Sequence, residues 1–386
     1  MNLTALVAFS GVFALGVIFS VLGSVKLKLA SALKIDDSKI GALISALMLS
    51  SLVAVLLIGP LSDMLGYRVI ALTGFSLGGV CLWWLACSKS YLSAFLSCMF
   101  LGVAAMCVNS VGNVMGPIIL FEGSDPARAS NLLNIAFCIG AIITPLIIVS
   151  ALGNTGHKKP LIVIGTIIFL PVIYSLFAIF PEPEEGFAII EALSLLGNSA
   201  VIISGLSLFC YISIEASMIG FITTFLRSHG LTEAKSGFFL GLFWVFLIIS
   251  RLLYAFLFKE PGDPAVVIPV LSVMSIAAIA VMVYARSAVL AVFGVLFAGF
   301  SFGPVFPTVV GVAFVKTGAI ALGNSGSVFG IVFAIGLLGG ATVPALIGRY
   351  ADKNGIRESL KIAMGVGVLL FIVSMALWLL VPVPSV

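Results

Sequence analysis

The run LTALVAFSGVFALGVIFSVLG, residues 3–23, carries no charged side chain, and its only polar side chains are those of Thr4, Ser10 and Ser20. A helix of about 20 apolar residues crosses the hydrocarbon core of a membrane, which is about 30 Å thick. No basic segment precedes the run, and it is too long for the apolar part of a secretory signal. We therefore interpret it as a retained membrane span.

The composition extends this interpretation to the whole chain. Of the 386 residues, 61% are hydrophobic and 9% are charged, whereas about 25% of the residues of a soluble domain are charged. The mean hydropathy is +1.30. The net charge of +4 comes from scattered lysines and arginines without a basic tract, so we expect a lipid bilayer as the solvent and no nucleic-acid partner.

Apolar runs separated by polar breaks predict twelve spans, at residues 3–23, 40–60, 69–86, 91–121, 132–152, 161–180, 201–226, 237–258, 266–284, 288–315, 328–347 and 362–381. The acidic stretch at residues 181–186 contains two prolines and reads as a connector. We therefore predict an all-α membrane protein with a six-helix half at 1–180, a connector at 181–198 and a second six-helix half at 199–386. Pro304 and Pro307 should bend the tenth span, and Gly326, Gly330, Gly336, Gly339 and Gly340 should let helices approach closely.

One polar motif separates the second and third spans. It reads Gly59-Pro60-Leu61-Ser62-Asp63-Met64-Leu65-Gly66-Tyr67-Arg68. The motif resembles the loop signature of the major facilitator superfamily, G-x-L-x-D-x-x-G-[RY]-[RK], and lies at the position that the superfamily requires. The alternative is an ordinary polar turn.

The resemblance implies a gate. We expect a tight loop that needs glycine at Gly59 and Gly66, and an Asp63 carboxylate that caps the eleventh span near Asn324 and Ser325. Arg68 would balance the charge of Asp63. Such a cap would lock one conformation of the two halves.

Shorter motifs are similar to the fucose permease branch of sugar symporters. They are Leu133-Asn134 with Gly140 and Pro145, Tyr211 with Glu215, Ser250-Arg251, Phe306-Pro307-Thr308, Gly339-Gly340-Ala341 with Pro344, and the stretch from Gly348 to Gly355. The resemblance implies a secondary active transporter in the cell membrane that moves a sugar with a proton. That branch couples protons through carboxylates in spans one and four, but span one here has none and span four has none before Glu122. Coupling would have to run through Glu215 or be absent.

Glu215 and Arg251 are the clear ionisable residues in the middle of spans. Such residues usually face a cavity or a partner. Glu215 could bind a substrate hydroxyl or carry the coupling proton, with Arg251 holding it ionised in one state. The two could equally form a fixed structural ion pair.

Several uncharged polar residues are further candidates for substrate binding. Asn109 and Asn113 lie four residues apart and share a helix face, and Asn134 lies near the start of span five. Amides suit a polyhydroxyl solute, although interhelical hydrogen bonding is the alternative. Tyr211 falls on the face of Glu215, and Trp244, one to two turns before Arg251, could stack on a sugar ring or simply pack.

Other classes of function have little support in the sequence. No metalloprotease motif, histidine cluster or hydrolase triad occurs, so we expect no enzyme activity, no catalytic or metal site and no cofactor. The expected partners are a small-molecule substrate and a proton, and the expected state is a monomer. An organic-anion carrier or exporter is the second transporter reading, and a non-transporting sensor is the third possibility.

The distribution of charge conflicts with the expected orientation. The resemblance places both termini in the cytoplasm, together with Arg68, Arg128, Lys259 and Lys316. The opposite ends of the spans hold Lys26, Lys28, Lys34, Lys39, Lys89, Lys158, Lys159, Arg227, Lys235, Arg286, Arg349, Lys353, Arg357 and Lys361. Cytoplasmic loops normally carry the excess of lysine and arginine. A miscounted helix is one explanation, and a basic face that attracts anionic solutes is another.

Overall fold

Helices account for nearly all of the structure, a computed structural model that describes residues 2–148, 156–182, 189–258 and 263–384. Those residues contain no strand. Twelve stretches are long and apolar enough to cross a membrane, at Leu3–Leu33, Ser38–Leu65, Tyr67–Cys87, Tyr91–Gly123, Pro126–Leu146, Lys158–Ser175, Ser199–Ser228, Glu233–Leu257, Pro264–Tyr284, Ala288–Thr317, Ser325–Asn354 and Ile356–Leu380. The predicted all-α membrane fold with twelve spans is confirmed.

The chain forms two compact units, each built from helices that pack on one another. The first comprises Met1–Gly123, Leu133–Leu193 and Leu322–Gly330, and the second comprises Ser124–Leu132, Ser194–Ala321 and Ile331–Val386. Two long helices therefore contribute several residues to each unit: α6 (Pro126–Leu146) starts in the second unit, and α15 (Ser325–Asn354) starts in the first. The start of α6 thus packs in the unit formed mainly by the C-terminal half of the sequence, and the start of α15 packs in the unit formed mainly by the N-terminal half.

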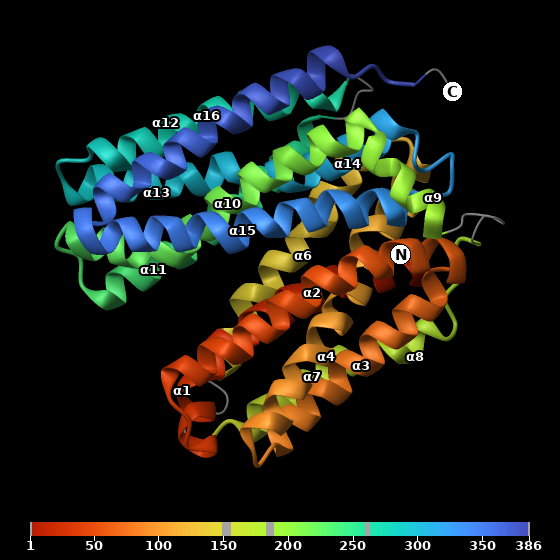
Figure 1. Cartoon of the computed structure of the whole chain (residues 1–386), viewed down its shortest axis with the longest axis horizontal. Coiled ribbons are helices and arrows are strands. Elements are labelled where there is room, and N and C mark those ends of the chain that lie inside the picture. The colour runs from red at the N-terminus through yellow and green to blue at the C-terminus, as the bar shows by residue number, and fades with distance from the viewer. Residues whose placement is uncertain (1, 149–155, 183–188, 259–262, 385–386) are drawn as a thin grey trace. The chain divides into compact units, whose positions relative to one another are not determined.

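The first unit contains the N-terminal helices (Figure 1). They are α1 (Leu3–Leu33), α2 (Asp37–Leu65), α3 (Tyr67–Cys87), α4 (Tyr91–Ser110), the π-helix η1 (Val111–Met115), α5 (Gly116–Ile119), the 3₁₀ turn η2 (Leu120–Gly123), α7 (Lys158–Phe169), α8 (Pro171–Ser175) and α9 (Ile189–Ser194). α3 packs on α4 and α7, while α4 also packs on α1 and α2. α4 therefore has neighbours on several sides, and its last two turns are buried.

The second unit contains the C-terminal helices. They are η4 (Leu195–Gly197), α10 (Ser199–Ser228), α11 (Glu233–Leu257), η5 (Pro264–Val266), α12 (Val267–Tyr284), α13 (Ala288–Phe302), α14 (Val305–Thr317) and α16 (Ile356–Leu380). α10 packs on α14 and α16. It also lies close to the part of α15 that belongs to this unit: a Cβ at Gly339 would lie only 2.2 Å from the carbonyl oxygen of Phe209. The predicted role of Gly339 in helix packing is confirmed.

Several predicted helix ends differ from the structure, including ends of the second, sixth, eleventh and twelfth spans, and two further differences have clear causes. The first span continues ten residues beyond Gly23, to Leu33, because nothing in this stretch breaks the helix before Lys34 adopts a left-handed conformation. The fifth span starts at Pro126 rather than Leu132, because Asp125 accepts a hydrogen bond from the Arg128 N–H at 3.0 Å and proline is well suited to a first helical turn. Polar residues at helix ends conceal these extensions from a search for apolar runs.

Prolines shape two of the spans. The tenth span is divided at Gly303 and Pro304 into α13 and α14, so the predicted bend is confirmed. Pro307 has no N–H to donate to the carbonyl of Gly303, four residues earlier. In span four, Pro117 likewise offers no N–H to the carbonyl of Asn113, and the π-helix η1 lies directly before it. Both breaks change the backbone next to candidate site residues.

A buried ion pair closes the end of the second unit. The ammonium of Lys316, at the end of α14, donates to Asp263 at 2.6 Å and to the carbonyl of Val381 at 2.7 Å. The Lys316 side chain is 2% exposed and that of Asp263 is 28% exposed. The pair therefore ties α14 to the start of η5 and to the end of α16.

Replacing Lys316 by methionine should lower the free energy of unfolding by about 2 kcal/mol, since removing one partner of a buried pair strands the other and the partial exposure of Asp263 reduces the cost. The measurement is the thermal unfolding midpoint of the purified protein in detergent. Lys361→Met is the matched control, because Lys361 pairs with Glu358 at 2.6 Å in an exposed setting. Equal midpoints for the two variants would contradict a stabilising role for the Lys316 pair.

Candidate functional site

The Asp63 carboxylate lies at the start of α15, within the first unit. Its two oxygens accept hydrogen bonds from the backbone N–H of Gly326 at 2.8 Å, from that of Ser327 at 2.7 Å and from the Ser327 hydroxyl at 2.7 Å. The first N–H groups of a helix lack partners inside the helix and carry a partial positive charge. Asp63 therefore caps α15, but it does so through Gly326 and Ser327 rather than at the predicted Asn324 and Ser325.

Of the other motif residues, Gly66 is the expected turn residue, whereas Gly59 and Arg68 differ from the prediction. Gly59 lies inside α2 rather than in the loop, and a Cβ there would lie 2.4 Å from the carbonyl oxygen of Gly326. Gly59 is thus needed for close helix contact, whereas Gly66 is the turn residue, with φ of +79°. Arg68 donates to the carbonyl of Leu176 at 2.9 Å, after the end of α8, rather than to Asp63. A cation suits that position, because carbonyls at a helix C-terminus carry partial negative charge.

The start of α6 makes contacts that the sequence reasoning missed. Within the second unit, Arg128 donates through Nε to the carbonyl of Ala255 at 2.7 Å, near the end of α11. Asn131 donates to the hydroxyl of Thr308 in α14 at 3.0 Å. A Cβ at Gly311 would lie 2.3 Å from the Cα of Ala127, so the two helices touch there. The helix-start signal at Asp125 and Pro126 is the feature that could have revealed this.

The three candidate asparagines of the first unit form one hydrogen-bonded chain. Asn113 donates to the Asn109 Oδ1 at 2.7 Å, and Asn134 donates to the Asn113 Oδ1 at 2.6 Å. Asn109 and Asn113 are fully buried, and Asn134 is 3% exposed. Asn113 lies in η1, and π-helical turns often occur at functional sites. The structure therefore brings together three of the predicted residues from spans four and five.

The second unit holds the charged candidates. The Tyr211 hydroxyl donates to the Glu215 carboxylate at 2.7 Å, one turn along α10. Arg251 lies close enough to interact electrostatically with Glu215. The guanidinium of Arg251, which is 2% exposed, donates through Nε to the carbonyl of Gly303 at 2.7 Å. Arg251 thus satisfies the carbonyl that Pro307 cannot, and holds the bend between α13 and α14.

Aromatic rings connect Tyr211 with Trp244 in the same unit. The ring centroids of Tyr211 and Phe302 are 6.4 Å apart, those of Phe302 and Phe243 are 6.1 Å apart, and those of Phe243 and Trp244 are 6.0 Å apart. Phe306 lies 6.5 Å from Tyr211. Trp244 therefore belongs to an aromatic cluster beside the Glu215 site and reaches Tyr211 through two phenylalanines.

Two further observations concern the remaining candidates. Among the described residues, no group of three or more histidine, cysteine, aspartate or glutamate side chains could hold a metal ion. Lys259 and residues 183–188 of the predicted connector lie outside the described residues.

Comparisons with known proteins agree with the architecture. A sequence profile described as the Major Facilitator Superfamily matches residues 5–343. A search of curated protein sequences found no match. The chain is similar in fold to the E. coli fucose:proton symporter FucP, with a TM-score of 0.80, 17% identity, and coverage of 97% of this chain and 99% of that one.

Two other solved structures are similar over nearly their full length. The proton:xylose symporter XylE, bound to 6-bromo-6-deoxy-D-glucose, has a TM-score of 0.77 and 14% identity, with 99% of this chain and 96% of that one covered. The human organic anion transporter TETRAN has a TM-score of 0.76 and 17% identity, with 96% of this chain and 99% of that one covered. At these identities the likeness concerns the fold.

Proposed function

The chain belongs to the major facilitator superfamily, and from this membership we propose that it moves a small polar solute, in the first instance a sugar, across the cell membrane by alternating access. It is a multi-pass membrane transporter by family and fold, which confirms the superfamily prediction. The sugar, the coupling proton, the monomeric state and the choice of membrane are parts of the proposal. Transporters of this architecture bind substrate near mid-membrane.

The observation that carries the proposal is the Glu215 site. Glu215 is the only acidic residue in the middle of any described span, and it accepts a hydrogen bond from Tyr211. A carboxyl group at membrane depth is costly and marks a substrate or proton site by default. The aromatic rings of the neighbouring cluster offer surfaces on which a sugar ring can stack.

Sugar recognition by amides is the second part of the proposal. The chain of Asn109, Asn113 and Asn134 contains both donors and acceptors, which match hydroxyl groups. Fully buried amides that bond to one another are also good structural links. A variant that separates the two roles is therefore needed.

Replacing Asn113 by leucine should raise the KM for the transported solute about tenfold, because one lost hydrogen bond to a bound solute costs about 1.4 kcal/mol. Uptake kinetics in proteoliposomes measure this change, with the thermal unfolding midpoint recorded alongside. Asn131→Leu is the matched control, since Asn131 lies in the contact between α6 and α14. A lower midpoint together with an unchanged KM would assign Asn113 a structural role only.

The same residues support a second candidate function. Arg251 is a buried cation beside Glu215, and a buried guanidinium can bind a carboxylate of a solute. TETRAN, described as an organic anion transporter, shares the fold. An organic-anion carrier is therefore the alternative proposal.

The experiment that separates the two is uptake into proteoliposomes. A radiolabelled monosaccharide panel and a carboxylate panel are each tested with and without an inward proton gradient. Sugar accumulation that depends on the gradient would support the symporter. Flux of carboxylates without sugar flux would favour the anion carrier, and substrate binding without any flux would exclude transport.

A further inference from the structure

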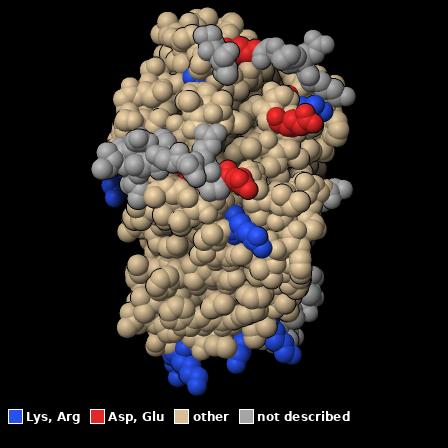
Figure 2. Space-filling view, turned by 90° about the vertical axis from the view of Figure 1, so that its right-hand side faces the viewer, with Lys and Arg blue, Asp and Glu red and all other residues tan. Residues whose placement is uncertain are grey.

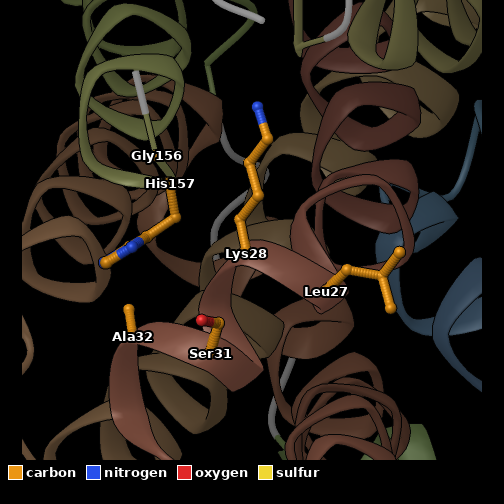
Figure 3. A pocket seen from close by; sticks show the side chains of 6 residues that line it. All are labelled: Leu27, Lys28, Ser31, Ala32, Gly156 and His157. Carbon is orange, nitrogen blue, oxygen red and sulfur yellow. The ribbon is translucent and has the colours of Figure 1, made fainter. Parts of the chain in front are cut away.

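A cavity of about 390 Å³ opens at the end of the first unit where α1 ends and α7 begins. Leu27, Lys28, Ser31 and Ala32 of α1 line one part of it, and Gly156 and His157 line the other (Figure 3). In that view the His157 side chain extends towards Ala32, and Leu27 lies on the far side of Lys28. None of these residues belongs to the proposed transport site.

The length of α1 places this cavity at the level of the lipid headgroups. α1 contains 31 residues and is therefore about 46 Å long, whereas the hydrocarbon core is about 30 Å thick. Its first charged residue is Lys26, so residues 27–32 lie beyond the apolar part of the helix. Trp83 and Trp84 lie near the end of α3, and Tyr91 begins α4 at the same end of the unit. Tryptophan and tyrosine concentrate at membrane interfaces.

This end of the first unit is strongly basic. Its helix ends and connecting segments hold Lys26, Lys28, Lys34, Lys39, Lys89, Lys158 and Lys159, against Asp36 and Asp37. The lower edge of the face in Figure 2, at the end where α1 meets α2, shows basic side chains and no acidic ones. Lys26 and Lys158, each next in sequence to a residue of the cavity, are exposed. The electrostatic potential there favours an anion.

We propose that the cavity between the end of α1 and the start of α7 binds the phosphate of an anionic phospholipid. The Lys28 ammonium and the Ser31 hydroxyl supply donors for phosphate oxygens. Leu27, which is 74% exposed, offers an apolar surface to the glycerol and the first acyl carbons. The assignment goes beyond transport and gives the basic end of the unit a function that does not depend on the orientation of the chain.

His157 forms one wall of the cavity. Its Nε2 is buried and has no hydrogen-bond partner among the residues that the structure describes, so the donors that a ligand meets are those of Lys28 and Ser31. Burial lowers the pKa of His157, and the permanent charge of the cavity therefore comes from Lys28.

The test uses the full-length protein, stripped of lipid in a neutral detergent. Binding of phosphatidylglycerol, phosphatidylcholine and inorganic phosphate is measured by native mass spectrometry across a concentration series. We expect wild-type protein to retain phosphatidylglycerol, and the K28Q/H157Q variant to bind it at least about tenfold more weakly, since charge-assisted hydrogen bonds are lost. Lys28→Arg should keep the affinity, because the charge and the donors remain.

Lys89→Gln is the matched control, since it removes one exposed lysine from the same end of the unit outside the cavity. It should bind phosphatidylglycerol as wild-type protein does. Equal weakening in Lys89→Gln and K28Q/H157Q would overturn the proposal in favour of a diffuse charge effect. Competition by inorganic phosphate at concentrations similar to those of the lipid would overturn the choice of a phospholipid, and equal retention of phosphatidylcholine would overturn the role of negative charge.

Discussion

Replacing Glu215 by glutamine is expected to abolish accumulation driven by a proton gradient. Glutamine keeps the size of the side chain and an acceptor for the Tyr211 hydroxyl, but it cannot take up or release a proton. With one proton per solute, a gradient of about two pH units can drive accumulation up to about 100-fold, since each pH unit is worth a factor of ten. The variant should bring the solute only to a concentration ratio of about one.

Two measurements make this result specific. Exchange of labelled for unlabelled solute across the membrane needs no net proton movement, so the Glu215→Gln variant should retain it. Glu233→Gln is the matched control, because Glu233 is exposed in the first turn of α11. Accumulation by Glu215→Gln at the wild-type level would remove Glu215 from proton coupling and leave it as a structural partner of Tyr211.

Replacing Asp63 by asparagine should weaken the contact between α2 and α15 by about 2 kcal/mol, which is a factor of about 30 in the population of the capped state. Hydrogen bonds to a charged acceptor contribute more than those to a neutral one, and Asp63 accepts three. The charge also interacts favourably with the start of α15. If capping locks one conformation during alternating access, the variant should open this end of the first unit more often.

Thiol labelling measures that opening. A cysteine introduced by Ser325→Cys, at a position that is 2% exposed at the start of α15, should react with a hydrophilic reagent about 30-fold faster when Asp63→Asn is present. The exposed Cys87 is first replaced by serine. Asp36→Asn is the control, since Asp36 caps α2 from an exposed position by accepting from the Lys39 N–H at 2.9 Å. Equal labelling rates in the two variants would show that Asp63 does not control access.

The spans were predictable because lipid imposes a simple requirement of length and polarity. Each of the twelve apolar runs corresponds to a membrane-length helical stretch among the described residues, and the division of the tenth span followed from Pro304 and Pro307. Helix ends were harder, since lipid does not constrain residues that leave the hydrocarbon. The first two turns of α6 hold Arg128, which lies before the predicted start of the fifth span, and the cap at Asp125 explains the earlier start.

Partners of buried polar residues could be predicted only where helix spacing determined them. Tyr211 and Glu215 lie one turn apart on one helix, and their hydrogen bond follows from that spacing. Arg251 was predicted to act on Glu215, and its hydrogen bond to the carbonyl of Gly303 on another helix was not predicted. The sequence shows that Pro307 cannot donate to the carbonyl of Gly303. That Arg251 donates to this carbonyl instead follows from the packing of α11 beside α13, which the sequence does not reveal. Likewise, the hydrogen bond from Arg68 to the carbonyl of Leu176 depends on how helices distant in sequence pack together.

The start of α6 belongs to the second unit, and the start of α15 belongs to the first. This exchange affects how the transporter could be assembled from two separate polypeptides. A gene divided within the connector would produce one polypeptide carrying Ser124–Leu132 and another carrying Leu322–Gly330, and each of these stretches packs in the unit formed mainly by the other polypeptide. Each fragment made alone would leave the sites for its missing stretch unfilled. Two co-expressed fragments would therefore recognise one another through these exchanged stretches, without a covalent link between them.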